Sequence, residues 1–164
     1  MQDIFISLGS NLGSPVNNLY RACDWLSQYP GLHKVATSTI YQTEPQGYKE
    51  QPWFANQVLW MHGDSTWEPS HLLAVLKQME EDMGRTHGPR YGPRLIDLDI
   101  LLFNGLVRRE KDLILPHPGL KSRAFVLIPL LEICPDISLP DGTKVQQLLT
   151  DLDYELDGNK IFQS

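Results

Sequence analysis

The chain has 164 residues, of which 41% are hydrophobic and 21% are charged, and its formal net charge is −6. This length predicts one domain over residues 1–164, and the composition is that of a globular protein, which excludes a disordered chain. The negative charge argues against a general nucleic-acid binder or a binder of anionic membranes, and no apolar run approaches the ~18 residues of a membrane span. Two distant cysteines without a Cys/His cluster predict reduced thiols in a soluble, cytoplasmic protein.

The first half of the chain alternates strand-like and helix-like segments. Residues 3–8 alternate in polarity and predict a strand. Ser14 and Pro15 are typical of a helix N-terminus, and apolar residues at helical spacing follow them until Pro30 and Gly31 end the helix. The next segments are predicted as a strand, a loop, a strand, an amphipathic helix, a loop and a strand, at 33–43, 44–53, 54–62, 70–83, 85–94 and 95–103.

The second half of the chain is less regular. Asn104 and Gly105 form a strong turn signal, which predicts a hairpin and a short return strand. Residues 122–133 predict an apolar helix that Pro129 must kink or divide, and residues 144–149 predict a last short helix. The order β-α-β-β-α-β is that of a ferredoxin-like split βαβ, an α/β (α+β) antiparallel sheet flanked by helices, here with C-terminal additions.

The last long strand carries two carboxylates. Alternation places Asp97 and Asp99 on one face of it, and the apolar residues of the other face are Ile96, Leu98, Ile100 and Leu102. Two like charges about 7 Å apart on one strand repel each other, and a divalent cation relieves that repulsion. Hard oxygen ligands suit Mg²⁺. The alternative is that both aspartates face solvent on a two-sided strand, and an isolated Asp-x-Asp pattern favours it.

The segment around the two aspartates is rich in arginine. Residues 85–123 carry a net charge of +4 and the rest of the chain carries −10. Arg85, Arg90 and Arg94 precede the aspartates, and guanidinium groups bind phosphate with two parallel hydrogen bonds. We therefore expect Mg²⁺-dependent phosphoryl transfer, with the loop that contains two Gly-Pro pairs as a mobile element. The sequence lacks the Walker motif and the kinase glycine loop, which excludes both standard kinase classes.

A second candidate site lies on the strand predicted at 54–62. Four of its side chains share one face: Phe54, Asn56, Val58 and Trp60. An aromatic ring beside an amide can stack on a flat heterocycle while the amide reads its polar edge. The alternative is that Phe54 belongs to the core, and spacing alone favours that alternative.

Several short motifs follow one another along nearly the whole chain: residues 7–13 (SLGSNLG), 41–47 (YQTEPQG), 54–56 (FAN), Glu80 with 84–85 (GR), 92–103 (GPRLIDLDILLF), 116–118 (PHP), 123–125 (RAF) and 129–130 (PL). Together they resemble the 6-hydroxymethyl-7,8-dihydropterin pyrophosphokinase family of folate biosynthesis. The resemblance implies an ATP-dependent diphosphotransferase that gives the pterin diphosphate and AMP. We expect a cytoplasmic monomer whose partners are ATP and the pterin, with no nucleic acid and no membrane.

The resemblance also implies roles for individual residues. Asp97 and Asp99 hold two Mg²⁺ ions between the ATP phosphates and the pterin hydroxymethyl oxygen, and Arg85 and Arg94 act in the transfer. The residues implied to contact ATP are Glu80, Tyr91, Arg94, Ile100, His117 and Arg123. The residues implied to bind the pterin are Thr43, Pro45, Gln46, Phe54, Asn56 and Phe125. Where the family often has a second arginine two positions after the first, this chain has His87.

Two other functions are compatible with parts of the pattern. A nucleotidyltransferase or cyclase with a ferredoxin-like palm also uses paired strand aspartates, but it releases pyrophosphate rather than AMP. A non-enzymatic RNA-binding module of the same fold class needs a basic, aromatic-rich sheet face. The charge of −10 outside the arginine-rich segment argues against that module.

Overall fold

A computed structural model of the chain describes residues 1–84 and 92–163. The strands are β1 (Gln2–Ser10), β2 (Leu32–Thr37), β3 (Tyr41–Thr43), β4 (Phe54–Gly63), β5 (Asp97–Phe103), β6 (Arg108–Glu110), β7 (Leu113–Leu115), β8 (Glu155–Asp157) and β9 (Lys160–Phe162). The helices are α1 (Pro15–Ser27), α2 (Pro69–Asp82), α3 (Ala124–Ile133), α4 (Val145–Thr150) and the short 3-10 helix η1 (Leu120–Ser122). Among these residues, no helix is long and apolar enough to cross a membrane.

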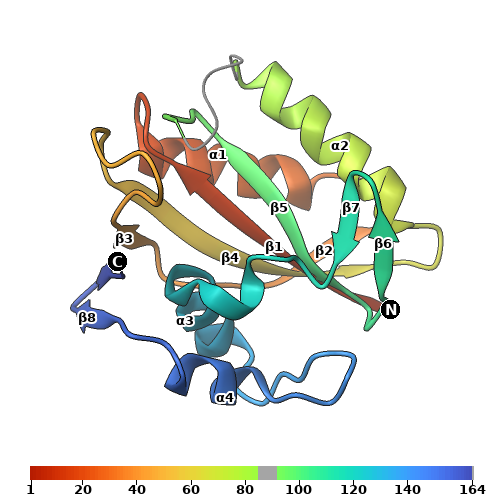
Figure 1. Cartoon of the computed structure of the whole chain (residues 1–164). Helices are drawn as coiled ribbons and strands as arrows, with labels where there is room; N and C mark the ends of the chain where they lie inside the picture. Colours follow the sequence, from red (N-terminus) through yellow and green to blue (C-terminus); the bar gives the residue numbers. More distant parts are fainter. Residues whose placement is uncertain (85–91, 164) are drawn as a thin grey trace.

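The main sheet has the strand order β5-β1-β4-β3-β9-β8, and β2 also pairs with β4. Strand β1 lies between β4 and β5 and is antiparallel to both. Strand β3 is antiparallel to β4, whereas β9 joins β3 in parallel, so the C-terminal strands extend the sheet at the edge formed by β3. Figure 1 shows this C-terminal hairpin beside β3, far from β5.

Helices cover both faces of this sheet (Figure 1). Ile4, Ile6 and Leu8 of β1 pack with the apolar sides of α1 and α2 in one core. Phe5 of β1 and Val58 of β4 belong to a second core with residues of α3 and α4. Alternation along β1 therefore divides its side chains between two apolar layers, and each fully buried large side chain contributes ~1.5–3 kcal/mol.

Most of the long predicted elements are present, but the strand predicted at 33–43 is divided into β2 and β3. Its pairing with β4 changes register twice, from His33↔His62 to Thr37↔Leu59 and then to Tyr41↔Asn56. Each change inserts one extra residue on this side of the ladder, which interrupts regular pairing. The prediction of one continuous strand is therefore wrong. The sequence does not reveal the break, because the segments on both sides of it have the same β-branched composition.

A bulge in β5 also changes one predicted side-chain direction. Ile6 pairs with Ile100, but Phe5 pairs with Leu102, so Leu101 is an extra residue on β5. Leu102 therefore belongs to the core under α3 and α4, and Phe103 takes its place in the core under α1 and α2. The prediction that Leu102 shares a face with Ile100 is wrong, since strict alternation does not survive a bulge.

The predicted turn after β5 is present, but its return strand does not pair with β5. Asn104 and Gly105 have φ angles of 48° and 69°, as a tight hairpin turn requires. Strand β6 then pairs with β7 in a separate two-stranded sheet. Helix α3 contains Pro129 and is one continuous element. The prediction that the return strand pairs with β5 is therefore wrong, because β6 pairs with β7 instead. The predicted helix near 122–133 is confirmed.

Candidate active site

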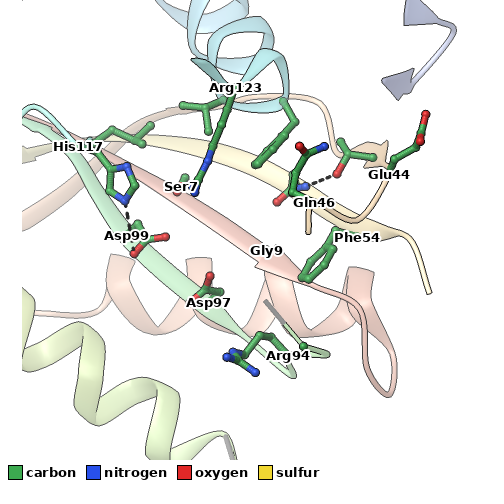
Figure 2. A pocket seen from close by; sticks show the side chains of 16 residues that line it. Ser7, Gly9, Glu44, Gln46, Phe54, Arg94, Asp97, Asp99, His117 and Arg123 are labelled. Atoms are coloured by element: carbon green, nitrogen blue, oxygen red, sulfur yellow. Dashed lines mark hydrogen bonds and ion pairs between the residues drawn. The ribbon is translucent and has the colours of Figure 1, made fainter. Parts of the chain in front are cut away.

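A cavity of about 290 Å³ opens on the sheet face that α3 covers (Figure 2). This volume is at the lower end of the ~300–1,000 Å³ range of small-molecule sites. Ten of the predicted site residues line it: Thr43, Gln46, Phe54, Asn56, Arg94, Asp97, Asp99, His117, Arg123 and Phe125. The structure thus brings residues from five separate segments of the chain to one surface.

Strand register explains why the two aspartates face this cavity. Asp97 lies opposite Gly9 and Asp99 lies opposite Ser7 on the neighbouring β1. Directly opposed residues of antiparallel strands face the same side of a sheet, so all four line the cavity. Because Ser7 and Gly9 are small, the floor beside the carboxylates stays open.

His117 faces the aspartates from the segment that follows β7. Its Nδ1 accepts a hydrogen bond from the N–H of Gly119 at 3.0 Å, so the ring proton is on Nε2. Nε2 lies 3.9 Å from Asp99 Oδ1. Burial and the Arg123 cation lower the pKa of His117 below its usual value, although Asp97 opposes them in part. At neutral pH the ring is therefore a neutral N–H donor directed to the acidic part of the cavity.

Arg94 is held through its main chain. Its N–H donates to Asn11 Oδ1 at 2.7 Å, and its carbonyl accepts the N–H of Asn11 at 2.9 Å. Asn11 also donates from Nδ2 to the carbonyl of Pro52 at 2.9 Å, in the segment before β4. The backbone from which the Arg94 guanidinium projects is therefore tied to two neighbouring segments.

Arg123 approaches the cavity from the N-terminal end of α3. A Cβ atom at Gly119 would lie 2.6 Å from Arg123 Cζ, so the guanidinium packs directly on this glycine. The same Cζ lies 5.8 Å from the ring centroid of Phe125. Figure 2 shows Asp97 and Asp99 between Arg123 and Arg94. Cationic groups thus flank the two carboxylates along one wall, an arrangement suited to a polyanion and its counter-ion.

The opposite end of the cavity combines aromatic and amide groups. Asn56 Nδ2 donates to Thr43 Oγ1 at 2.5 Å, which fixes the orientation of the amide. Asn56 pairs across the sheet with Gly9, and a Cβ atom at Gly9 would lie 2.8 Å from Asn56 Oδ1. Phe54 is half-buried and lines the cavity, so it is not simply a core residue. This end therefore offers a ring and an oriented amide to a flat ligand.

Three predicted residues are described by the structure but lie outside the cavity lining. Glu80 is 6% exposed, and its Oε2 accepts the N–H of Leu98 at 3.1 Å on β5. Ile100 belongs to the core under α1 and α2, and Pro45 is buried beside Glu44. Arg85, Tyr91 and the substitution at His87 lie outside the described residues.

Sequence reasoning missed other lining residues, among them Ser7, Gly9 and Glu44. Part of the role of Ser7 and Gly9 could be predicted from the sequence, since small residues at alternate positions interrupt an otherwise apolar strand. Their role depends on the residues that lie opposite them, which the local sequence does not specify.

The donor set at the aspartates fits Mg²⁺. Within residues 1–84 and 92–163, no group of three or more His, Cys, Asp or Glu side chains forms a candidate metal site. Mg²⁺ does not need such a cage, because it binds through one or two carboxylates together with substrate phosphates and water. Asp97 and Asp99 supply these oxygen donors on the cavity wall, and Arg94 and Arg123 accompany them there.

Comparisons with known proteins agree on one family. Residues 5–135 match the family model described as 7,8-dihydro-6-hydroxymethylpterin-pyrophosphokinase (HPPK). The chain is 38% identical over 155 residues to the 2-amino-4-hydroxy-6-hydroxymethyldihydropteridine pyrophosphokinase of Pseudomonas aeruginosa, with 94% of each chain covered. It is 41% identical over 133 residues to the protein of the same name from Bacillus subtilis, with 81% of this chain and 78% of that protein covered.

Solved structures share the fold. A crystal structure of HPPK-DHPS in complex with substrates has a TM-score of 0.70 at 14% identity and covers 92% of this chain. A Plasmodium falciparum HPPK-DHPS triple mutant with STZ-DHP has a TM-score of 0.74 at 16% identity and covers 91% of this chain. This chain spans 45% and 43% of those two longer chains. At such identities the likeness establishes the architecture alone, a mixed α/β fold with a sheet flanked by helices.

Proposed function

Because this chain belongs to the 7,8-dihydro-6-hydroxymethylpterin-pyrophosphokinase family, we propose that the cavity over its sheet is the active site and that Asp97 and Asp99 are its Mg²⁺ ligands. The enzyme transfers pyrophosphate from ATP to hydroxymethyldihydropterin in folate synthesis. The observation that supports the site is the pair of carboxylates between two guanidinium groups on one wall.

The positions of the charges suggest how ATP is held. Arg94 and Arg123 bind phosphate oxygens from the two sides of the aspartates, and the neutral His117 donates from Nε2. Asp97 and Asp99 would hold two Mg²⁺ ions, which would supply neutralisation of the charge on the phosphates and orientation of the reacting oxygens. Reaction at the β-phosphorus, rather than at the γ-phosphorus, is what the pyrophosphate transfer of the family implies.

The aromatic end of the cavity positions the second substrate. Phe54 and Phe125 contact the faces of the pterin ring, while Asn56, Thr43 and Gln46 bind its polar edge. The pterin hydroxymethyl oxygen attacks the β-phosphorus, the bond from that phosphorus to the α-phosphate oxygen breaks, and AMP leaves. Catalysis of this kind depends on positioning and on charge stabilisation, without a covalent enzyme intermediate.

Product analysis tests the reaction. The enzyme is incubated with ATP, Mg²⁺ and 6-hydroxymethyl-7,8-dihydropterin, and the nucleotides are separated by chromatography. We expect AMP and the pterin diphosphate in equal amounts, and no product after chelation of Mg²⁺. ADP as the main nucleotide product would indicate transfer of the γ-phosphoryl group, and free pyrophosphate with a nucleotidyl product would indicate the nucleotidyltransferase alternative.

Three further properties belong to the proposal. The antiparallel order β5-β1-β4-β3, with α1 after β1 and α2 after β4 on one face, supports a ferredoxin-like classification. We propose that residues 1–164 act as one pyrophosphokinase domain and as a cytoplasmic monomer. Sedimentation equilibrium tests the monomer, and cell fractionation tests the location.

Replacement of Phe54 by alanine is expected to weaken pterin binding by roughly 1–3 kcal/mol, the range for loss of an aromatic stack on a heterocyclic base. Affinity for ATP is expected to change much less, because the phosphates are bound by guanidinium groups and carboxylate-held Mg²⁺, whereas the Phe54 ring offers a stacking surface to a flat ligand. Calorimetric titration with each ligand measures both effects. Equal losses for the two ligands would show instead that Phe54 supports the whole domain as a core residue.

Replacement of Gly9 by alanine is expected to weaken pterin binding by roughly 1–3 kcal/mol, as overpacking does. The new methyl group approaches Asn56 Oδ1 within 2.8 Å and displaces the amide from Thr43. The matched control is the same substitution in an Asn56→Ala background, where Gly9→Ala is expected to add little. An additive effect in that background would contradict a role through Asn56.

A further inference from the structure

The C-terminal hairpin packs against the cavity walls although it lies outside the family match, which ends at residue 135. Strand β9 pairs in parallel with β3, with Thr43 opposite Ile161. Ile161 is 1% exposed and packs in a small core with Tyr41, Ala124 and Ile128. The hairpin is therefore held at the edge of β3 and packs against α3, and Thr43, the residue opposite Ile161, lines the cavity.

Gln163 follows this hairpin and makes hydrogen bonds to two segments of the cavity wall. Its side-chain Oε1 accepts the N–H of Ala124 at 2.8 Å, and its Nε2 donates to the carbonyl of Ser122 at 2.8 Å. Its main-chain carbonyl accepts a hydrogen bond from Gln46 Nε2 at 3.1 Å. One residue thus ties the start of α3 to the segment after β3.

The bond to Ala124 satisfies a group that the helix itself leaves without a partner. Ala124 is the first residue of α3, and the first N–H groups of any α-helix have no acceptor within the helix. Ala124 is also completely buried, so this N–H has no access to bulk water. The Gln163 amide therefore acts as a helix cap supplied from a distant part of the chain, and it fixes where α3 begins.

The neighbouring residue Phe162 reaches a third segment of the wall. Its ring packs edge-on against Trp53, with 5.2 Å between centroids, and Trp53 directly precedes Phe54. The segments that the C-terminal residues contact are thus the ones that carry Gln46, Phe54 and Phe125. The hydrogen bonds of Gln163 reach Gln46, Ser122 and Ala124, in the two segments that carry Gln46 and Phe125.

We propose that Gln163 is a positioning residue for the pterin-binding end of the cavity, a role that rests on the function proposed above. By holding the first turn of α3 it sets the position of the Phe125 ring relative to the pterin. A stacked ring has a narrow range of productive geometries, so a small shift of α3 weakens pterin binding. Arg123 lies on the same turn, but its long side chain can follow such a shift and still reach a phosphate.

The test is Gln163→Ala in the full chain, with Gln146→Ala as the matched control. Gln146 is an exposed residue of α4, so the control makes the same chemical change away from the cavity. We expect the dissociation constant for the pterin to rise about 5- to 30-fold, which corresponds to loss of one or two hydrogen bonds. The dissociation constant for a non-hydrolysable ATP analogue is expected to stay within about 3-fold, and the control is expected to match the wild type.

A purely structural role predicts a different result, namely a lower melting temperature with unchanged affinity of the folded protein for the pterin. That result overturns the proposal, and so does an equal loss for the pterin and the ATP analogue. If Gln163→Ala does not fold, Gln163→Glu is used, because it keeps the acceptor for the N–H of Ala124 and removes the donor to the carbonyl of Ser122. An affinity for the pterin between those of the wild type and a variant without either bond is then expected. Wild-type affinity of Gln163→Glu overturns the proposal. AMP formation by the wild type tests the proposed function separately.

Discussion

Replacement of Asp97 or Asp99 by asparagine is expected to lower kcat by several orders of magnitude, at least ~10³-fold, while the fold persists. Each substitution keeps the size of the side chain but removes one negative charge from the proposed Mg²⁺ site. The two carboxylates project from the same face of β5, so removal of one of them also relieves repulsion between like charges. Single-turnover kinetics with ATP and the pterin measures the effect on the transfer step.

The control for the aspartates is Asp112→Asn. Asp112 is an exposed carboxylate between β6 and β7, outside the cavity lining. We expect wild-type kcat for this control, and none of the three variants is expected to have a melting temperature below that of the wild type. Near-native activity of Asp97→Asn or Asp99→Asn at ordinary Mg²⁺ concentration would be incompatible with the proposed metal site. A higher Mg²⁺ requirement in the variants is a second expected sign of a weakened site.

Replacement of Arg94 by alanine is expected to weaken ATP binding by about 1.5–3 kcal/mol, the range for a hydrogen bond to a charged group, and to lower kcat as well. The main chain at this residue stays clamped by Asn11, whose two hydrogen bonds do not involve the guanidinium. The loss of ATP affinity is therefore due to the missing guanidinium and not to a rearranged main chain. Equilibrium titration with an ATP analogue measures the affinity, and pre-steady-state kinetics measures the chemical step.

Two other variants make the Arg94 result specific. Arg94→Lys keeps the charge but loses the two-pronged geometry, so only partial recovery is expected. Arg109→Ala removes an exposed arginine of β6, away from the cavity lining, and is expected to behave as the wild type. If Arg94→Ala binds ATP as tightly as the wild type, this guanidinium does not contact phosphate in the ground state.

The long elements of the fold could be predicted because their patterns are local. Strand β1 directs alternate apolar side chains to the core under α1 and α2, and helix α2 buries side chains at helical spacing; both periods are present in the sequence. Strands of three residues, such as β8 and β9, are too short to show a period. They form because a partner strand is available, in the case of β9 the edge of β3.

Local patterns also fail where the backbone departs from regular geometry. Strict alternation predicts the wrong face for Leu102, because one extra residue at Leu101 reverses the alternation. The turn at Asn104 was correct, since positive φ angles are favoured by these residue types. The partner of β6, the strand that follows the turn, is not predicted correctly, because strand pairing depends on segments that the turn does not contain.

The candidate site also has one part that follows from local sequence and another that depends on the tertiary structure. Asp97 and Asp99 share a face because they are two residues apart in one strand, so the sequence by itself determined that they form an acidic pair. Only the tertiary structure decided what surrounds that pair: Gly9 lies opposite Asp97, and Gln163 caps α3 from 39 residues away. Spacing along a strand is set by covalent geometry, whereas neighbours across a sheet or under a helix are set by packing of the whole chain.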